Sequence, residues 1–332
     1  MRNIILSLLI LSSYSKFSFA EELISHGQWT FDGFVDLRYQ EGDLNSYSNG
    51  FLFHDGAVQI LGEFKNNYSL YLDISLGWQK EVDSNNDGVP DNFENTWGVA
   101  KDRAQAFLMH KNSIFKIILG QFDSPFGFEN NDSRDLFFAK HGLMFRLYTP
   151  TTHLGVKAEA KIIESIEFHV IASNPQGQGS YAGESPEYGV QILFRSGDFY
   201  LLPGYYTRRE QNESYSLWNF YAGLNTKVYN LHLEFNSYTE PQLKKSSMGY
   251  MLLGAVRISD WWTLATRLEL ADRLQTKTST FLESIYQTSF SLHYHINESL
   301  KVLTDITSVT NLLSNDVEKT EREYTLSFQQ IF

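Results

Sequence analysis

The residues with the most specific chemistry form a run of oxygen-bearing side chains that begins at Asp83. Calcium loops space their oxygen ligands over about twelve residues, and Ca²⁺ takes about six to eight oxygens. Gly88 falls where such a loop turns sharply, whereas Pro90 and the absence of flanking amphipathic helices argue against an EF-hand. We therefore predict a structural Ca²⁺ in a long loop over residues 80–101, with a solvated acidic loop as the alternative. The expected ligands are Asp83, Asn85, Asp87, Val89 through its carbonyl, Asp91 and Glu94.

A second group of charged residues lies in the long connection 124–152, which Pro125 and Gly127 open with a sharp reversal. The connection is also rich in aromatic side chains, which need a place to be buried. The lumen of a wide barrel could hold it, and its polar members would then line the narrowest point. The alternative is that these charges sit in water on the outer surface. The candidate constriction residues are Glu129, Asp132, Arg134, Asp135, Lys140 and Arg146.

Several other kinds of chemistry find no support. The chain has no cysteine, which excludes disulfides, thiolate metal sites and a cysteine nucleophile. His293 and His295 share one face of a strand-like segment, but nothing supplies a third ligand. We find no Ser-His-Asp set, phosphate loop or zinc motif. A formal net charge of -12 argues against nucleic acid as a partner.

The elements that must position these residues are strands with alternating side chains. From Tyr68 to Gln79, apolar residues take every second position and polar or small residues mostly fill the others. At about 3.3 Å per residue and a tilt of about 45°, such a segment covers the apolar band of roughly 25 Å in a membrane barrel. Sixteen segments show this pattern: 28–40, 52–65, 68–79, 102–111, 115–123, 153–162, 166–173, 188–196, 199–208, 215–227, 229–238, 247–258, 261–271, 284–296, 300–310 and 322–332.

The connections between these segments alternate between short and long. Short ones fall near residues 66, 112, 164, 197, 228, 260 and 298, and long ones near 41–51, 80–101, 124–152, 174–187, 209–214, 239–246, 272–283 and 311–321. Membrane barrels have tight turns at one end and long loops at the other. The predicted fold is therefore all-β: a transmembrane antiparallel up-and-down β-barrel of about 16 strands, with 14 to 18 compatible.

The inward rows of this barrel carry basic and acidic residues in nearly equal numbers. No ion selectivity follows from such a balance. The alternative is that these charged residues are simply the polar side chains expected in any water-filled barrel interior. The candidate pore-lining cations of the wall are Arg38, Lys116, Lys157, Arg195, Arg257 and Arg267.

The two ends of the chain suggest export to a membrane. Arg2, an apolar run and a small-residue end at Ala20 are typical of a signal peptide over residues 1–20. Residues 21–332 then form a single barrel domain. The last strand ends at Phe332, like the terminal strand by which the barrel-assembly machinery recognises its clients, although Gln330 departs from that pattern.

The stretch from Gly120 to Glu129, with Gly155-Val156 after it, carries a resemblance to a known family. Its Gly-x-Phe-x-x-Pro-Phe-Gly-x-Glu pattern resembles the putative β-barrel porin-2 family and, more loosely, the phosphate-selective porins. The resemblance implies a porin of a Gram-negative outer membrane, a passive channel for small hydrophilic solutes or ions. It also implies outer-membrane lipid around the barrel and a constriction in the 124–152 loop, and the barrel would be a homotrimer or a monomer. A closed barrel serving as adhesin or receptor, and an outer-membrane barrel enzyme, remain the alternatives.

Overall fold

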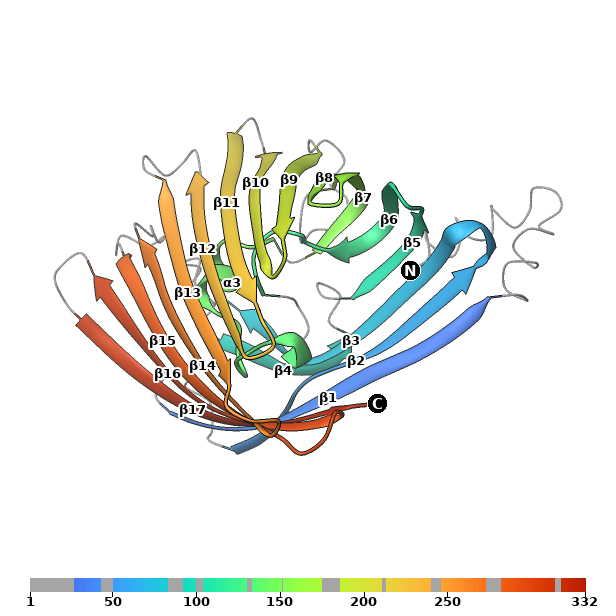
Figure 1. Cartoon of the computed structure of the whole chain (residues 1–332). Coiled ribbons are helices and arrows are strands. Elements are labelled where there is room, and N and C mark those ends of the chain that lie inside the picture. The colour runs from blue at the N-terminus through green and yellow to red at the C-terminus, as the bar shows by residue number, and fades with distance from the viewer. Residues whose placement is uncertain are drawn as a thin grey trace.

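The computed structural model describes residues 27–42, 50–82, 92–99, 104–129, 133–150, 152–174, 186–210, 213–239, 246–272, 282–313 and 318–332. Strands standing side by side around a ring dominate these residues (Figure 1). The strands are β1 (Gln28–Gly42), β2 (Gly50–Phe64), β3 (Tyr68–Val82), β4 (Asn92–Val99), β5 (Gln105–Lys111), β6 (Phe115–Asp123), β7 (Thr152–Ile163), β8 (Ile166–Ser173), β9 (Glu187–Ser196), β10 (Phe199–Glu210), β11 (Glu213–Asn225), β12 (Tyr229–Thr239), β13 (Ser247–Arg257), β14 (Trp262–Asp272), β15 (Leu282–His295), β16 (Leu300–Leu313) and β17 (Glu318–Ile331). The helical turns are η1 (Lys65–Asn67), η2 (Ser133–Asp135) and α3 (Leu143–Leu147).

Neighbouring strands pair antiparallel, and β1 pairs with both β2 and β17, which closes the ring. Strand β3 pairs with β5 over Tyr68–Asp73 and with β4 over Leu76–Val82, so β4 lies beyond the end of β5. Of the seventeen strands in the described residues, sixteen therefore make the wall. The prediction of an antiparallel barrel of about 16 strands is confirmed. No helix among the described residues is long and apolar enough to cross a membrane.

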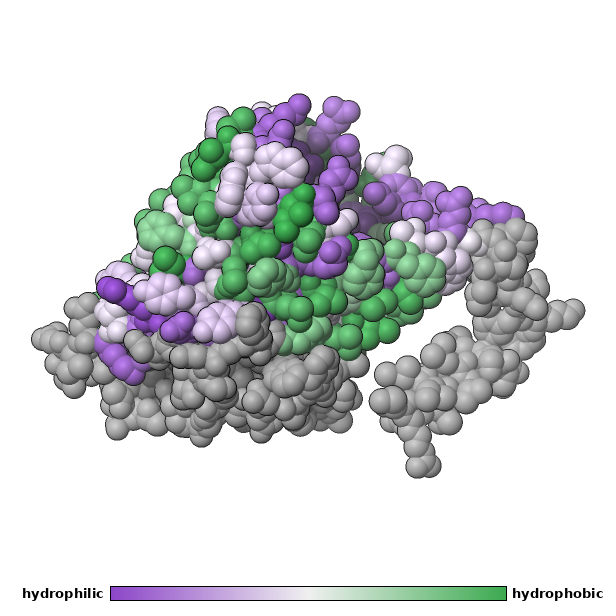
Figure 2. All heavy atoms as spheres, turned by 90° about the horizontal axis from the view of Figure 1, so that it is seen from below, coloured by the Kyte–Doolittle hydropathy of each residue, from purple (hydrophilic) through white to green (hydrophobic). Residues whose placement is uncertain are grey.

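The alternation of side chains sorts each strand into an inner and an outer face. In β3, Ser69, Asp73 and Ser75 are buried inside, whereas Ile74 between them is 43% exposed on the outside. Figure 2 shows hydrophobic residues gathered over one outer side of the barrel, with hydrophilic residues toward its edges. Such an outer surface suits hydrocarbon, because only every second residue has to meet lipid.

Short turns at one end of the barrel are built from residues that favour tight reversals. Asn66 and Asn67, between β2 and β3, adopt φ angles of 64° and 65°, a left-handed conformation that asparagine tolerates. Between β5 and β6, the Oδ1 atom of Asn112 accepts hydrogen bonds from the backbone N–H groups of Ile114 and Phe115, each 2.8 Å long. These local bonds satisfy the turn backbone without further residues.

At the opposite end the strands run further than the sequence pattern indicates. β10 ends at Glu210 and β11 begins at Glu213, so the connection predicted at 209–214 is only two residues long. Likewise β16 and β17 take up most of the predicted loop 311–321. Strand ends that lie beyond the apolar band do not contact lipid, so they need no apolar residue at every second position. Hydrophobic alternation therefore does not reveal them.

Strand β4 is a correction to the predicted loop 80–101. Its ladder with β3 pairs Lys80 with Glu94 and Val82 with Asn92, so the hairpin extends as a sheet beyond the wall. Residues 83–91, with most of the predicted calcium ligands, lie outside the described residues, as does the predicted signal peptide over residues 1–20.

The last residue takes part in closing the ring. The backbone N–H of Phe332 donates to the carbonyl of Gly33 over 2.9 Å, and the N–H of Gly33 donates back over 3.0 Å. The Phe332 side chain is 65% exposed. The start of the described chain and its end therefore meet at one rung of the sheet.

Candidate channel interior

Buried polar side chains of the wall bond to one another across neighbouring strands. Asp36 of β1 accepts hydrogen bonds from Arg38 at 2.6 Å, Ser327 at 2.6 Å and Gln329 at 3.2 Å. On β3, Asp73 accepts from Gln59 at 2.8 Å in the same way. Buried charges of this kind are tolerated because their hydrogen bonds are made within the protein.

The β6–β7 connection, residues 124–151, runs through the interior of the barrel. Its hydrogen bonds reach inward-facing side chains of β1, β2, β9 and β12 to β17. Helix α3 within it packs against β13 and β14 (Figure 1). Acidic wall residues accept its backbone donors: Glu234 from Phe128 at 3.1 Å, and Glu269 from Met144 at 3.1 Å. The backbone of a segment without sheet partners is satisfied in this way.

Arg267 of β14 is the centre of the attachment. Its guanidinium pairs with Glu129 of the connection and lies 3.0 Å from Glu269 of its own strand. It also lies 4.4 Å from the centroid of the Phe138 ring and donates to the carbonyl of Lys140. The Arg267 side chain is 1% exposed. Burial raises the pKa of Glu129, and the neighbouring carboxylate of Glu269 adds to the shift against the opposing pull of Arg267.

Further polar anchors hold other points of the connection to the wall. They lie on β1, β2, β15 and β17, which form one arc of the ring, so several points of the connection are held to the same side of the barrel. The pairs are Arg134 with Asp32 (3.0 Å) and Gln59 (2.6 Å), Lys140 with Glu323 (2.7 Å), and Arg146 with Gln287 (3.0 Å).

Tyr148 fixes the end of the connection to β13. Its hydroxyl lies 2.7 Å from Ser247 Oγ and donates to the carbonyl of Met248 over 2.9 Å. Burial raises the pKa of Tyr148 to about 12. The hydroxyl therefore stays protonated at neutral pH and remains a donor.

Strand glycines make room for the apolar side chains of the connection. A Cβ atom at Gly189 of β9 would lie 2.8 Å from the Phe126 ring, and one at Gly204 of β10 would lie 2.9 Å from it. Phe126 itself is 1% exposed. Neither glycine was predicted to matter for the interior. Their place within strands instead of turns was the available signal, because a strand glycine often marks close approach of another segment.

The remaining predicted constriction and wall residues differ in their surroundings. Asp135 is exposed and Asp132 lies outside the described residues. Arg38 points inward but is 0% exposed, like the paired Arg267, so neither faces open water. Lys116 and Lys157 are partly exposed and contact Glu159. The two cations beside short turns, at the ends of β9 and β13, are exposed: Arg195 and Arg257.

The predicted calcium ligands Asp83, Asn85, Asp87, Val89 and Asp91 lie outside the described residues. Glu94 lies in β4, where the backbone register alone is described.

A closed antiparallel ring with a polar inside, an apolar outside and one long connection folded inward defines the class of outer-membrane porins. The chain belongs to the family described as putative beta-barrel porin-2, OmpL-like, whose model matches residues 29–303. It is therefore a porin of the Gram-negative outer membrane, and its fold is that of a channel. No curated protein matches the chain.

Solved structures with a similar fold include an outer membrane channel and an anion-selective porin. The outer membrane channel DcaP of Acinetobacter baumannii superposes with a TM-score of 0.67 at 10% identity, covering 93% of this chain and 98% of that one. OprB of Pseudomonas putida gives 0.66 at 10% identity, covering 95% and 96%. The anion-selective porin from Comamonas acidovorans gives 0.63 at 10% identity, covering 92% and 100%. A trimer form of OmpT from Vibrio cholerae gives 0.62 at 11% identity, covering 92% and 100%.

Proposed function

We propose that small hydrophilic solutes or ions diffuse between the β6–β7 connection and the wall formed by β5 to β8. The observation that carries this path is where the polar anchors of the connection lie in the described part of the chain: on β1, β2, β9 and β12 to β17. Toward β6 and β8 the connection instead shares a buried apolar cluster with Ile118, Phe122 and Ile171. Charged side chains of β6 to β8 bond instead to one another and keep part of their surface exposed, as in Lys116, which is 28% exposed. The connection would narrow the channel from one side, with Asp135 on its exposed surface.

The absence of native cysteine gives a clean test of this path. Lys157→Cys places a thiol on the proposed pathway, and Gln287→Cys places one beneath the connection, where Gln287 is 3% exposed. Single channels of each variant would be recorded in a planar bilayer before and after a charged methanethiosulfonate reagent is added.

We expect the reagent to lower the current of Lys157→Cys and to leave Gln287→Cys and the wild type unchanged. Modification of Gln287→Cys alone would contradict the proposed path. A protein that carries no current at all would favour an adhesin, receptor or barrel enzyme over a porin.

A structural calcium ion in the β3–β4 hairpin is a second proposal, supported by the ligand spacing of residues 83–94. The ladder pairs Val82 with Asn92, which brings the two ends of the acidic stretch together. We expect Ca²⁺ to protect residues 80–101 from protease. Alanine at Asp83, Asp87 and Glu94 should abolish that protection, while Glu298→Ala, an exposed acid in a short turn, should not. Protection that survives the triple change would contradict the site.

Partners of the whole barrel follow from its outer surface and its last strand. We propose outer-membrane lipid around the apolar face, recognition of the β17 end by the barrel-assembly machinery, and association into a homotrimer. The trimer form of OmpT supports the last of these only by fold. Cross-linking of membranes that contain the protein, followed by denaturing electrophoresis, should give a band at three times the monomer mass. A persistent monomer would contradict the trimer.

A further inference from the structure

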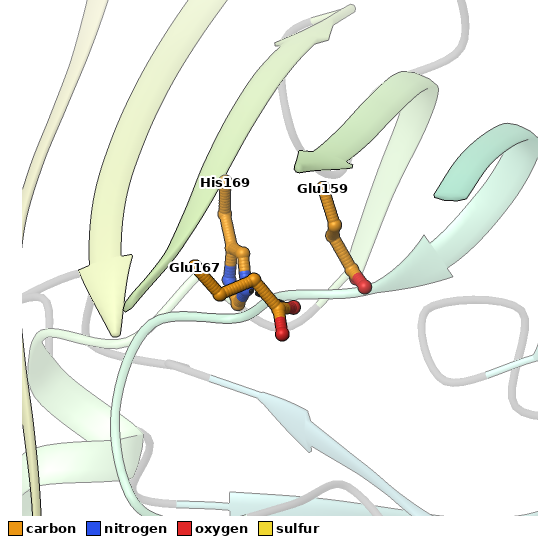
Figure 3. Close-up of side chains that lie close together, drawn as sticks. All are labelled: Glu159, Glu167 and His169. Carbon is orange, nitrogen blue, oxygen red and sulfur yellow. Dashed lines mark hydrogen bonds and ion pairs between the residues drawn. The ribbon is translucent and has the colours of Figure 1, made fainter. Parts of the chain in front are cut away.

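Three metal-ligating side chains meet on the inner wall of β7 and β8. Glu159 of β7 lies directly opposite His169 of β8 in the strand register, and Glu167 precedes His169 by two residues on the same face. Figure 3 shows the three side chains reaching into the interior from these neighbouring strands. One ligand atom from each lies within 4.8 Å of the other two. Small rotamer changes would therefore bring all three to one ion.

The donor set indicates which ions could bind. One imidazole nitrogen and two carboxylates suit borderline divalent ions such as Zn²⁺, whereas Ca²⁺ and Mg²⁺ prefer all-oxygen surroundings. The Nε2 atom of His169 already lies 2.8 Å from Glu167. Its Nδ1 atom is buried and has no hydrogen-bond partner among the described residues. The His169 side chain is 12% exposed, so it is mostly buried but can still be reached by an ion in the lumen.

Two lysines set the strength of binding. Lys116 lies 2.5 Å and Lys157 lies 3.3 Å from the Glu159 carboxylate. A metal ion must compete with these cations for Glu159 and is repelled by them. Binding should therefore be reversible, and removing one lysine should tighten it.

We propose that Glu159, Glu167 and His169 form a binding site for a divalent transition metal ion of the Zn²⁺ class on the channel wall. The effect on current rests on the proposed pathway along β5 to β8, because an ion held there would narrow that pathway and oppose passing cations. Metal binding itself does not depend on the protein conducting.

The test uses protein refolded in detergent, without a histidine tag and treated with chelator. Zn²⁺ binding is measured by titration calorimetry, and single-channel current is recorded with and without Zn²⁺. His169→Ala and Glu167→Gln each remove one ligand, and Lys157→Met removes one competing cation. His295→Ala removes an inward-facing histidine that contacts Thr263 on β14 instead.

We expect His169→Ala and Glu167→Gln to weaken Zn²⁺ binding by about tenfold or more, since even the loss of a residue that only orients a ligand costs about 10–100-fold. Lys157→Met should strengthen binding, and His295→Ala should leave it unchanged. Ca²⁺ at the same concentrations should neither bind here nor lower the current. Equal weakening by His295→Ala, or equal binding in the wild type and both ligand variants, would overturn the site.

The two readouts separate this site from the channel proposal. A protein that conducts but neither binds Zn²⁺ nor loses current to it would overturn the metal site and leave the channel intact. A protein that binds Zn²⁺ through His169 but carries no current would support the site and overturn the channel.

Discussion

Single glycines in the wall decide how closely the β6–β7 connection approaches it. Gly189 and Gly204 lie on neighbouring strands, and the Phe126 ring occupies the space that their side chains would need. The ring can be buried there only because both positions lack a Cβ atom.

We expect Gly189→Ala to displace the Phe126 ring and to destabilise the protein by about 1–3 kcal/mol, the usual cost of overfilling a packed site. The variant should unfold at lower temperature and show a noisier channel. Gly254→Ala is the matched control, because a Cβ atom there would meet only Thr266 at 4.0 Å. Equal melting temperatures for the two variants would show that packing of the Phe126 ring does not require the space left by Gly189.

Arg267 offers a second test at the scale of one residue. Arg267→Met leaves Glu129 and Glu269 buried without their cation, a loss of roughly 3–5 kcal/mol. The double variant Arg267→Met with Glu129→Gln removes one of the two stranded charges and should recover part of that stability. Urea unfolding in detergent measures the free energy of unfolding of both variants. A double variant that is no more stable than Arg267→Met alone would contradict the pairing of Arg267 with Glu129.

For single residues, the sequence predicted whether a side chain points into or out of the barrel. It did not predict whether an inward side chain contacts water or is buried. The alternation of apolar and polar residues predicted that Arg38 and Arg267 point inward, as they do. Their burial depends on Asp36 in one case and on Glu129, far away along the chain, in the other. A pairing across such a distance leaves no periodic trace in a single sequence.

Among the elements, the β6–β7 connection is the one whose removal should change the channel most. Deleting residues 130–146 takes away all of α3 except Leu147, together with the anchors Arg134, Lys140 and Arg146. Single-channel conductance should rise, because the segment proposed to narrow the lumen is gone. Shortening the β14–β15 connection by a few residues serves as control and should leave conductance unchanged. A deletion with wild-type conductance would place the constriction elsewhere.

Element prediction succeeded where one face meets lipid and failed where it does not. The sixteen wall strands each present an apolar row, which a hydrophobic period of two reveals. Strand β4 was missed because it extends the hairpin beyond the wall, among residues rich in turn formers. The extensions of β10 and β11 were missed for the same reason.

For the whole molecule, the decisive contact is the closure between β1 and β17. Phe332→Ala keeps the two backbone bonds to Gly33 but removes a large exposed aromatic ring from the end of the last strand. If the assembly machinery reads this end, the variant should reach the outer membrane in smaller amounts. Refolding into detergent in vitro should be affected far less. Heat-dependent mobility on a denaturing gel, applied to membranes and to refolded protein, measures both, and equal loss in both would indicate a role in stability alone.

The rung between Gly33 and Phe332 also decides whether the sheet has free edges. The β17 end is bonded to Gly33 near the start of β1, so a chain that lacks β17 cannot form this closure. Such a chain keeps two unpaired strand edges, which are templates for aggregation. Pairing of β1 with β17 therefore protects the barrel from association through strand edges as well as completing its wall.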